Sequence, residues 1–557
     1  MSQSVTDPQT STSALTIVAA ADAAAAALPD RDLVVRGDWR FTYAQIAERS
    51  KRLAAYLHGR GLGCRTERSE LAGHEVGQDL LGIYAYNGNE YIESTIGSFR
   101  ARVAPFNVNY RYAGAELRHL LADAGATALV YHAAFAPVLA QVLPDLPRLE
   151  VLIQIADDSG NELLDGAVDY ETVIAGTEPR RLPEPSPDDL YVLYTGGTTG
   201  MPKGVLWRQY DIYMAGCGGR NNQTGEVVGS AAEIGERAAA NPGLNLMILP
   251  PLMHGAAQWA FLTAMTTGQT IVFPSVVDRF DAEDVVRTIE RERAAIVIVV
   301  GDAVARPLLA VVEAKKPDLS SMVALASGGA VLSPALKQRW IEAVPGLVVF
   351  DAVGASETGA QLHHVSAAGF VSSGTFAAGV DTCVVAADFG AVLEPGHDGI
   401  GWLAQKRFTP LGYKGDAAKT AETFPTIGGV RLVLPGDRAR HLANGDIELL
   451  GRDSVTVNSG GEKIFVEEVE VAISSHPGVA DVVVVGRPSE RWGQEVVAIV
   501  ARAVGTETTA EELIDHAAET LSRYKLPKAV LFRPEIVRSP VGKADYRWAH
   551  DQAVAAN

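Results

Sequence analysis

Cysteine is scarce in this chain of 557 residues, where only Cys64, Cys217 and Cys383 are found, and no two of them form a CxxC pair. That pattern argues against a disulfide framework or a thiolate metal site and is typical of the reducing cytoplasm. Basic residues are also few, with 48 Lys and Arg against 67 Asp and Glu and a formal net charge of -19. Such a charge repels phosphate backbones and anionic lipids, so neither nucleic-acid binding nor membrane anchoring is expected.

Long apolar runs are missing as well. No stretch of the sequence approaches the roughly 18 apolar residues of a membrane span. The first thirty residues have no basic segment, and Asp22 interrupts their apolar part, so we expect no secretory signal and a cytoplasmic protein. The first dozen residues are polar and are expected to be frayed. The chain is too long for one compact core, which predicts at least two domains.

Helix and strand patterns alternate along the chain, which predicts an α/β fold with largely parallel sheets covered by helices. In one unit, Asp281 is expected to cap a helix that carries Val285, Val286 and Ile289 on one face. The β-branched run at 295–300 follows, and it is predicted to be a strand buried on both faces. Further strands are predicted over residues 246–249, 270–273, 323–325 and 347–350.

A second, smaller α+β domain is predicted near the C-terminus. Strands are expected at 482–485 and 496–500, followed by a helix at 510–522. The polar link at 451–454 follows a strand-like segment at 447–450, so we place a large domain at 1–451, a hinge at 452–454 and a mobile small domain at 455–557. The Gly- and Ala-rich segment at 216–241 is predicted to be a surface excursion.

The strongest motif is Tyr-Thr-Gly-Gly-Thr-Thr-Gly-Met-Pro-Lys-Gly over residues 194–204. Its glycines permit a tight turn that brings N–H groups close to an anion, and its threonines and lysine add donors and charge. Pro202 stands where a Walker A loop has glycine, so the motif is a different phosphate loop. A glycine-rich hairpin is the alternative. The predicted phosphate-binding residues are Thr195, Gly196, Gly197, Thr198, Thr199, Gly200 and Lys203.

This loop and several later motifs resemble, in order, those of the adenylate-forming (ANL) superfamily, and the resemblance extends from about residue 41 to residue 546. It implies ATP, Mg²⁺ and coenzyme A as ligands, and it leaves a homodimer open. The residues implied to contact the nucleotide are Gly328, Gly329 and Ala330 against adenine, Asp351 at its amino group, Ser356 at the α-phosphate, and Asp437 and Arg452 at the ribose. The chain departs from the family pattern at Val353, Pro435 and Ser454, where an aromatic residue, Ser or Thr, and a charged hinge residue are usual.

The resemblance also implies which residues act in the reaction. Glu357 would bind Mg²⁺, because this ion prefers few carboxylates together with phosphate oxygens and water. Lys543 would bridge the substrate carboxylate and the α-phosphate, and His254 would gate the acyl pocket. After a rotation of the small domain, the loop with Gly460, Gly461 and Lys463 would replace Lys543. Without the other motifs, each of these residues would be read as an ordinary loop or surface side chain.

The reaction implied is the joining of a carboxylic acid to AMP, with release of pyrophosphate, followed by transfer of the acyl group to coenzyme A. Small and apolar residues follow His254, and none of them is an acid placed for an α-amino group. This pattern suits an apolar acid. The segments at 194–209, 250–259 and 351–361 resemble those of bacterial fatty-acid and steroid-acid CoA ligases, which implies a medium- or long-chain fatty acid or a steroid side-chain acid. Two alternatives stay open: an acyl-AMP ligase that loads a carrier protein, although no carrier domain follows before Asn557, and a non-catalytic nucleotide-binding protein.

Overall fold

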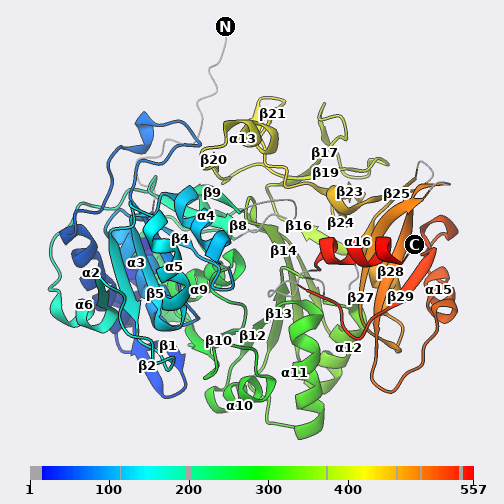
Figure 1. Ribbon diagram of the computed structural model, residues 1–557, viewed down its shortest axis with the longest axis horizontal. Coiled ribbons are helices and arrows are strands. Elements are labelled where there is room, and N and C mark those ends of the chain that lie inside the picture. The colour runs from blue at the N-terminus through cyan, green and yellow to red at the C-terminus, as the bar shows by residue number, and fades with distance from the viewer. Residues whose placement is uncertain are drawn as a thin grey trace.

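The computed structural model describes residues 15–112, 114–195, 202–221, 223–330, 332–371, 374–459, 462–489, 492–538 and 544–556, with the backbone alone at 454, 462 and 463. The predicted frayed segment at 1–12 lies outside these ranges. A large part built on two extended sheets is followed by a smaller part with its own sheet, at the right of Figure 1. No helix in the described ranges has both the length and the apolarity needed to cross a bilayer.

The larger sheet runs through the middle of the molecule. Its neighbours β10, β11, β12, β13 and β14 are parallel, whereas its two ends are antiparallel. In spatial order, its fourteen strands within the described residues are β18 (Val392–Leu393), β17 (Thr382–Val385), β19 (Gly401–Gln405), β23 (Asp437–His441), β24 (Ile447–Arg452), β16 (Thr375–Ala378), β15 (Gly359–Ser366), β14 (Val348–Ala355), β13 (Ala324–Gly328), β12 (Ile296–Val299), β10 (Asn245–Ile248), β11 (Thr270–Phe273), β1 (Asp32–Arg36) and β2 (Trp39–Thr42).

The second sheet lies beside the first, at the left of Figure 1. It is parallel from β4 through β7, and β8 turns back antiparallel into β9. Its order is β20 (Gly412–Tyr413), β9 (Lys203–Arg208), β8 (Leu190–Thr195), β4 (Ala104–Asn107), β3 (Leu80–Tyr84), β5 (Ala128–His132), β6 (Val151–Ile155) and β7 (Ala167–Asp169). The N-terminal hairpin of β1 and β2 belongs to the other sheet, because Val34 pairs with Ile271.

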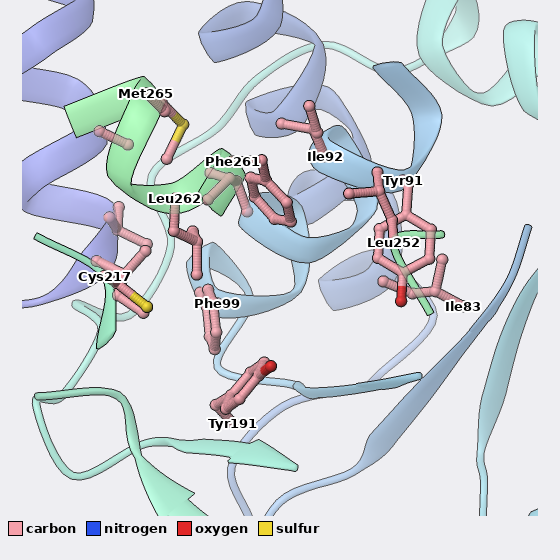
Figure 2. Packing of buried hydrophobic residues seen from close by; sticks show 14 of the residues in the cluster. Ile83, Tyr91, Ile92, Phe99, Tyr191, Cys217, Leu252, Phe261, Leu262 and Met265 are labelled. Carbon is pink, nitrogen blue, oxygen red and sulfur yellow. The ribbon is translucent and has the colours of Figure 1, made fainter. Parts of the chain in front are cut away.

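Helices cover these sheets and supply the core between them. Figure 2 shows Tyr91, Ile92 and Phe99 of α3 packed beside Phe261, Leu262 and Met265 of α9, with Tyr191 of β8 below them. The helices are α1 (Ile17–Ala27), α2 (Tyr43–Gly59), α3 (Asn89–Arg100), α4 (Gly114–Ala124), α5 (Ala136–Val142), α6 (Tyr170–Gly176), α7 (Gln209–Gly216), α8 (Ala231–Ala240), α9 (Gly255–Thr266), α10 (Ala282–Glu292), α11 (Gly301–Lys315), α12 (Pro334–Ala343) and α13 (Ala417–Thr423).

The small domain has a separate core around a five-stranded sheet. Strand β28 lies at its centre between β27, β25 and β29, and α16 packs on β27. Its elements are β25 (Val457–Ser459), β26 (Glu462–Ile464), α14 (Val466–Ser474), β27 (Val479–Ser489), β28 (Gly493–Arg502), α15 (Ala510–Ala518), β29 (Ala529–Phe532) and α16 (Tyr546–Ala555).

The predicted unit around Asp281 is confirmed in its helix and in the presence of its strand, but the predicted burial of that strand on both faces is wrong. The Asp281 side chain accepts a hydrogen bond from the Asp284 N–H and caps α10, whose Val285, Val286 and Ile289 are buried. Strand β12, in contrast, alternates between buried and half-buried residues instead of being buried on both faces. The half-buried side chains of Ile296 and Ile298 pack at the margin of the core.

Two other predictions need correction. The segment at 216–241 contains α8, which packs against α1 and buries Ile234 and Ala238, so it is not a surface excursion. The polar link at 451–454 is more regular than predicted: Gly451 and Arg452 end strand β24, and a short 3₁₀ turn (Asp453–Val455) follows. The helix predicted at 510–522 ends earlier, because α15 stops at Ala518.

Candidate active site

A buried amide joins the strand before the phosphate loop to the loop before α9. Asn107, at the end of β4, donates from Nδ2 to the carbonyls of Tyr194 (2.8 Å) and Met253 (2.7 Å) and accepts from the Tyr194 N–H (2.7 Å). Asn107 is 5% exposed, so these bonds do not compete with water. Thr195, which ends β8, and His254, which precedes α9, are therefore held close to the same amide.

Lys203 begins strand β9 on the far side of the phosphate loop. Its ammonium lies 2.7 Å from Asp416 and 5.9 Å from the ring centre of Tyr413. The side chain is 48% exposed, and an ion pair that faces water in this way contributes only about 0–1 kcal/mol. A phosphate group can therefore replace Asp416 as the partner of Lys203 at little cost. The hydrogen bond from Lys203 also lowers the pKa of Asp416.

Glu357 lies in the turn between β14 and β15 and meets the same tyrosine. The Tyr413 hydroxyl donates to Glu357 Oε1 at 2.8 Å. The neighbouring Ser356 carbonyl accepts from the indole N–H of Trp207 at 2.8 Å, which fixes the turn against β9. A half-buried carboxylate oriented by one hydrogen bond fits a Mg²⁺ ion whose other ligands are phosphate oxygens and water.

Tyr413 connects three of the predicted residues. Burial raises the pKa of its hydroxyl, the charge of Glu357 raises it further, and the charge of Arg452 lowers it. Tyr413 therefore lies near the Lys203 ammonium and contacts Glu357, whereas Arg452 acts on it only through its charge.

The predicted adenine wall is formed by the ends of β13 and β14. Gly328 pairs with Ala352, and Gly329 has φ +81°, a backbone conformation that favours glycine. Ala330 follows directly. Val353, which replaces the usual aromatic residue, packs with Leu362 in an apolar cluster.

Asp437 and Arg452 pair across β23 and β24, and the Arg452 Nε lies 3.4 Å from the Asp437 carboxylate. Pro435 and Gly436 form the turn before Asp437, with the Gly436 carbonyl accepting from the Asp453 N–H at 3.1 Å. The pair therefore stands directly beside the predicted hinge.

Glu467 of α14 crosses that hinge from the small domain. Its carboxylate accepts a hydrogen bond from the Arg452 N–H at 3.2 Å. Gly451 leaves it room: a Cβ at that position would lie 2.1 Å from Glu467 Oε2. Burial raises the pKa of Glu467 to about 7, and the charge of Asp437 adds to this effect.

Several predicted residues lie outside the described ranges, so their placement stays a prediction. Lys463 lies in β26, where its backbone pairs with Asn458. The residues outside are Gly196, Gly197, Thr198, Thr199, Gly200, Gly460, Gly461 and Lys543.

Sequence reasoning missed four residues of this region: Asn107, Lys337, Tyr413 and Asp416. Tyr413 and Asp416 belong to the run Gly-Tyr-Lys-Gly-Asp at 412–416, where an aromatic, a cationic and an acidic side chain surround two glycines. That density of polar groups next to a turn was an available signal. Asn107 and Lys337 belong to no motif of this kind.

Comparison with known proteins identifies the chain. An AMP-binding enzyme model matches residues 21–409, and an AMP-binding enzyme C-terminal domain model matches residues 468–543. A medium-chain acyl-CoA ligase of Mycobacterium avium is 68% identical over 98% of this chain and 99% of its own length. A 3-oxocholest-4-en-26-oate–CoA ligase of Rhodococcus rhodochrous is 39% identical over 94% of this chain and 93% of its own length.

Solved structures share the fold. An anthranilate CoA ligase bound to anthranoyl-AMP has a TM-score of 0.82 at 20% identity and covers 98% of both chains. A fatty acyl CoA synthetase of Mycobacterium tuberculosis has a TM-score of 0.69 at 23% identity and covers 97% of this chain and 99% of its own. The two models and the full-length relatives lead to one conclusion: this chain belongs to the AMP-binding enzyme family.

Proposed function

We propose that this protein is an ATP-dependent acyl-CoA ligase that activates a medium-chain fatty acid. The observation that carries the proposal is the approach of Lys203 and Glu357 to Tyr413, together with the pair of Arg452 and Asp437. Together they offer two cations, a carboxylate for a divalent metal and a carboxylate for ribose hydroxyls. The acid is inferred from the relative of Mycobacterium avium, and a steroid side-chain acid is the second candidate on account of the relative of Rhodococcus rhodochrous.

A carboxylate is a poor electrophile, because its charge is shared by two oxygens. Attack of one oxygen on the α-phosphorus of ATP breaks the bond to the β-phosphate oxygen, releases pyrophosphate and leaves acyl-AMP. Attack of the thiolate of coenzyme A on the acyl carbon then expels AMP. The obstacle in the first step is the repulsion between two anions, and preorganised cations lower it.

The described residues divide this work. Lys203 leaves its ion pair with Asp416 and binds the outer phosphates instead. Arg452 and Asp437 hold the ribose. Glu357, oriented by Tyr413, would hold Mg²⁺, which would neutralise phosphate charge when bound. Lys543 would supply the donor between the substrate carboxylate and the α-phosphate.

The small domain is proposed to turn about residues 452–454 between the two steps. The orientation described here is proposed to be the adenylating one. Tyr546, the first residue of α16, supports this, because the charge of Arg452 beside the hinge acts on its hydroxyl. We also place the reaction in the cytoplasm, as the free thiols of Cys64, Cys217 and Cys383 support.

The function is tested by pyrophosphate release with ATP, Mg²⁺ and a panel of fatty acids and steroid side-chain acids, with and without coenzyme A. Multiple turnovers that require coenzyme A and favour medium-chain acids are expected. A single turnover with coenzyme A present would identify a carrier protein as the acceptor. No release with any acid would contradict the proposal and favour a nucleotide-binding protein.

Replacing Tyr413 by phenylalanine is expected to raise the Mg²⁺ concentration for half-maximal pyrophosphate release by roughly 10-fold, the low end of the effect of losing an outer-shell partner. The reason is that Glu357 loses the hydrogen bond that orients it. The exposed Tyr524 offers a matched control, and Tyr524→Phe should leave the Mg²⁺ titration unchanged. An unchanged titration in Tyr413→Phe itself would remove Tyr413 from the proposed site.

The pH dependence of acyl-AMP formation is expected to depend on Glu467. The pKa of Glu467 is raised to about 7 in this orientation. Protonated Glu467 therefore stabilises this orientation fully below the ordinary carboxyl pKa, and the stabilisation is lost as pH rises through about 7. Glu467→Gln keeps an acceptor for the Arg452 N–H and cannot ionise. The rate of the wild type divided by that of Glu467→Gln should therefore fall several-fold between pH 5.5 and pH 8. A ratio that stays constant over this range would refute the assignment.

A further inference from the structure

A buried ion pair lies behind the predicted adenine wall. Lys337 of α12 places its ammonium 2.5 Å from Asp351 Oδ2 of β14, and the two side chains are only 7% and 12% exposed. Around them, α12 and β14 bury Leu336, Trp340 and Val349. Moving two charges out of water costs several kcal/mol per ion, so such a pair is weak evidence for stability and calls for another explanation.

Asp351 faces a second titratable group. Across the antiparallel pair of β14 and β15, it stands directly opposite His364. Burial lowers the pKa of His364, which disfavours a cation there. Burial raises the pKa of Asp351, whereas the charge of Lys337 and, less strongly, that of His364 lower it. Lys337, which contacts the carboxylate directly, is therefore the main group that favours the ionised form of Asp351.

The ionisation state of Asp351 decides which base it can recognise. An ionised carboxylate only accepts hydrogen bonds, whereas a protonated one also donates. Adenine presents an amino donor at its C6 edge, and the 6-oxopurines present an acceptor there. Asp351 Oδ2 is enclosed against Lys337, which leaves Oδ1 as the oxygen able to meet a base.

We propose that Lys337 is a positioning residue that holds Asp351 as an ionised acceptor and thereby sets the preference of the nucleotide site for a 6-aminopurine over a 6-oxopurine. The inference rests on the proposed function in one respect, the use of ATP, with its adenine beside Asp351 as the family resemblance implies. Selectivity by this polar edge carries more weight in this chain than in relatives with an aromatic residue at the position of Val353, because stacking on a ring favours any purine.

The test compares ATP with inosine triphosphate in the full chain. For Lys337→Met, the KM for ATP in pyrophosphate release should rise about 10-fold with kcat nearly unchanged, and the ratio of kcat/KM for ATP over inosine triphosphate should fall about 10-fold. Asp351→Asn in the Lys337→Met background removes the charge that needed Lys337 and should recover most of the affinity for ATP. Lys315, in an exposed pair with Glu283 at 2.8 Å, is the control, and Lys315→Met should change neither value.

Equilibrium binding of the two nucleotides, measured by calorimetry without any acid, separates this inference from the proposed function. A preference for ATP that Lys337→Met abolishes supports the inference even if no acid is ever activated. Equal binding of ATP and inosine triphosphate by the wild type overturns it, and so does an unchanged preference in Lys337→Met. If Lys337→Met does not fold, the double variant serves alone, and a preference for ATP over inosine triphosphate as large as that of the wild type would overturn the inference, because an amide donates as well as accepts.

Discussion

Replacing Lys543 by alanine is expected to lower the rate of acyl-AMP formation by about 100- to 1,000-fold, the usual cost of losing one charge-stabilising donor at a reacting centre. The lysine would contact both anions only while they approach each other, so the loss should appear in kcat more than in the KM for ATP. Pyrophosphate release in a single turnover, with ATP and acid both saturating, measures the step directly.

The second half-reaction provides the control for Lys543. Thioester formation from pre-formed acyl-AMP and coenzyme A should be largely spared, because the proposed rotation removes Lys543 before the thiol attacks. Lys528, an exposed lysine of the same domain, serves as the matched variant, and Lys528→Ala should leave both steps unchanged. An equal loss in both half-reactions of Lys543→Ala would contradict the proposed role.

Replacing Gly451 by alanine is expected to reduce acyl-AMP formation by about 100-fold. Gly451 has φ +119°, where a side chain is strained by about 1–3 kcal/mol. The new methyl group would lie 2.1 Å from Glu467 Oε2, so this carboxylate must swing away and release the Arg452 N–H. A combined cost of about 3 kcal/mol against the described orientation corresponds to that loss in rate.

Gly445→Ala is the control that distinguishes backbone strain from crowding of Glu467 in Gly451→Ala. Gly445 also has a positive φ, +88°, but a Cβ there would meet no atom within 4 Å. Gly445→Ala should therefore show the backbone cost alone, whereas Glu467→Ala in the Gly451→Ala background should recover the part due to crowding, about 10-fold. Equal effects of Gly451→Ala and Gly445→Ala on acyl-AMP formation would show that Glu467 does not hold the small domain.

Much of the fold could be predicted from the sequence, because hydrophobic periodicity and caps are local signals. Asp281 capping α10 is one example, and strand β11 has the predicted bounds. The prediction of a surface excursion at 216–241 was wrong, for a different reason. The segment's small residues read as a loop, but α8 is stabilised by packing against α1, some two hundred residues earlier, and no local pattern records that contact.

The candidate site also contains residues that local motifs predicted and residues that they did not. Lys203, Glu357 and Asp437 stand in contiguous motifs whose order could be recognised. Tyr413 and Lys337 act on those residues from other segments, Tyr413 on Glu357 and Lys337 on Asp351, and sequence spacing does not reveal such pairs. Glu467 stands in the first turn of α14, where an acidic residue suits the helix dipole, yet it also reaches across the hinge to Arg452.

The pairing of β1 with β11 affects how the chain emerges during synthesis. Val34 can pair with Ile271 only after roughly 240 further residues have been synthesised. At about 5–20 residues per second, the N-terminal hairpin has its partner strand missing for on the order of 10–50 s. Val34 and Val35, each 1% exposed in the folded protein, are uncovered during that interval. The first strand of the chain is thus a long-lived apolar edge on the ribosome, and it is where a nascent chain of this protein would bind a holdase chaperone or aggregate.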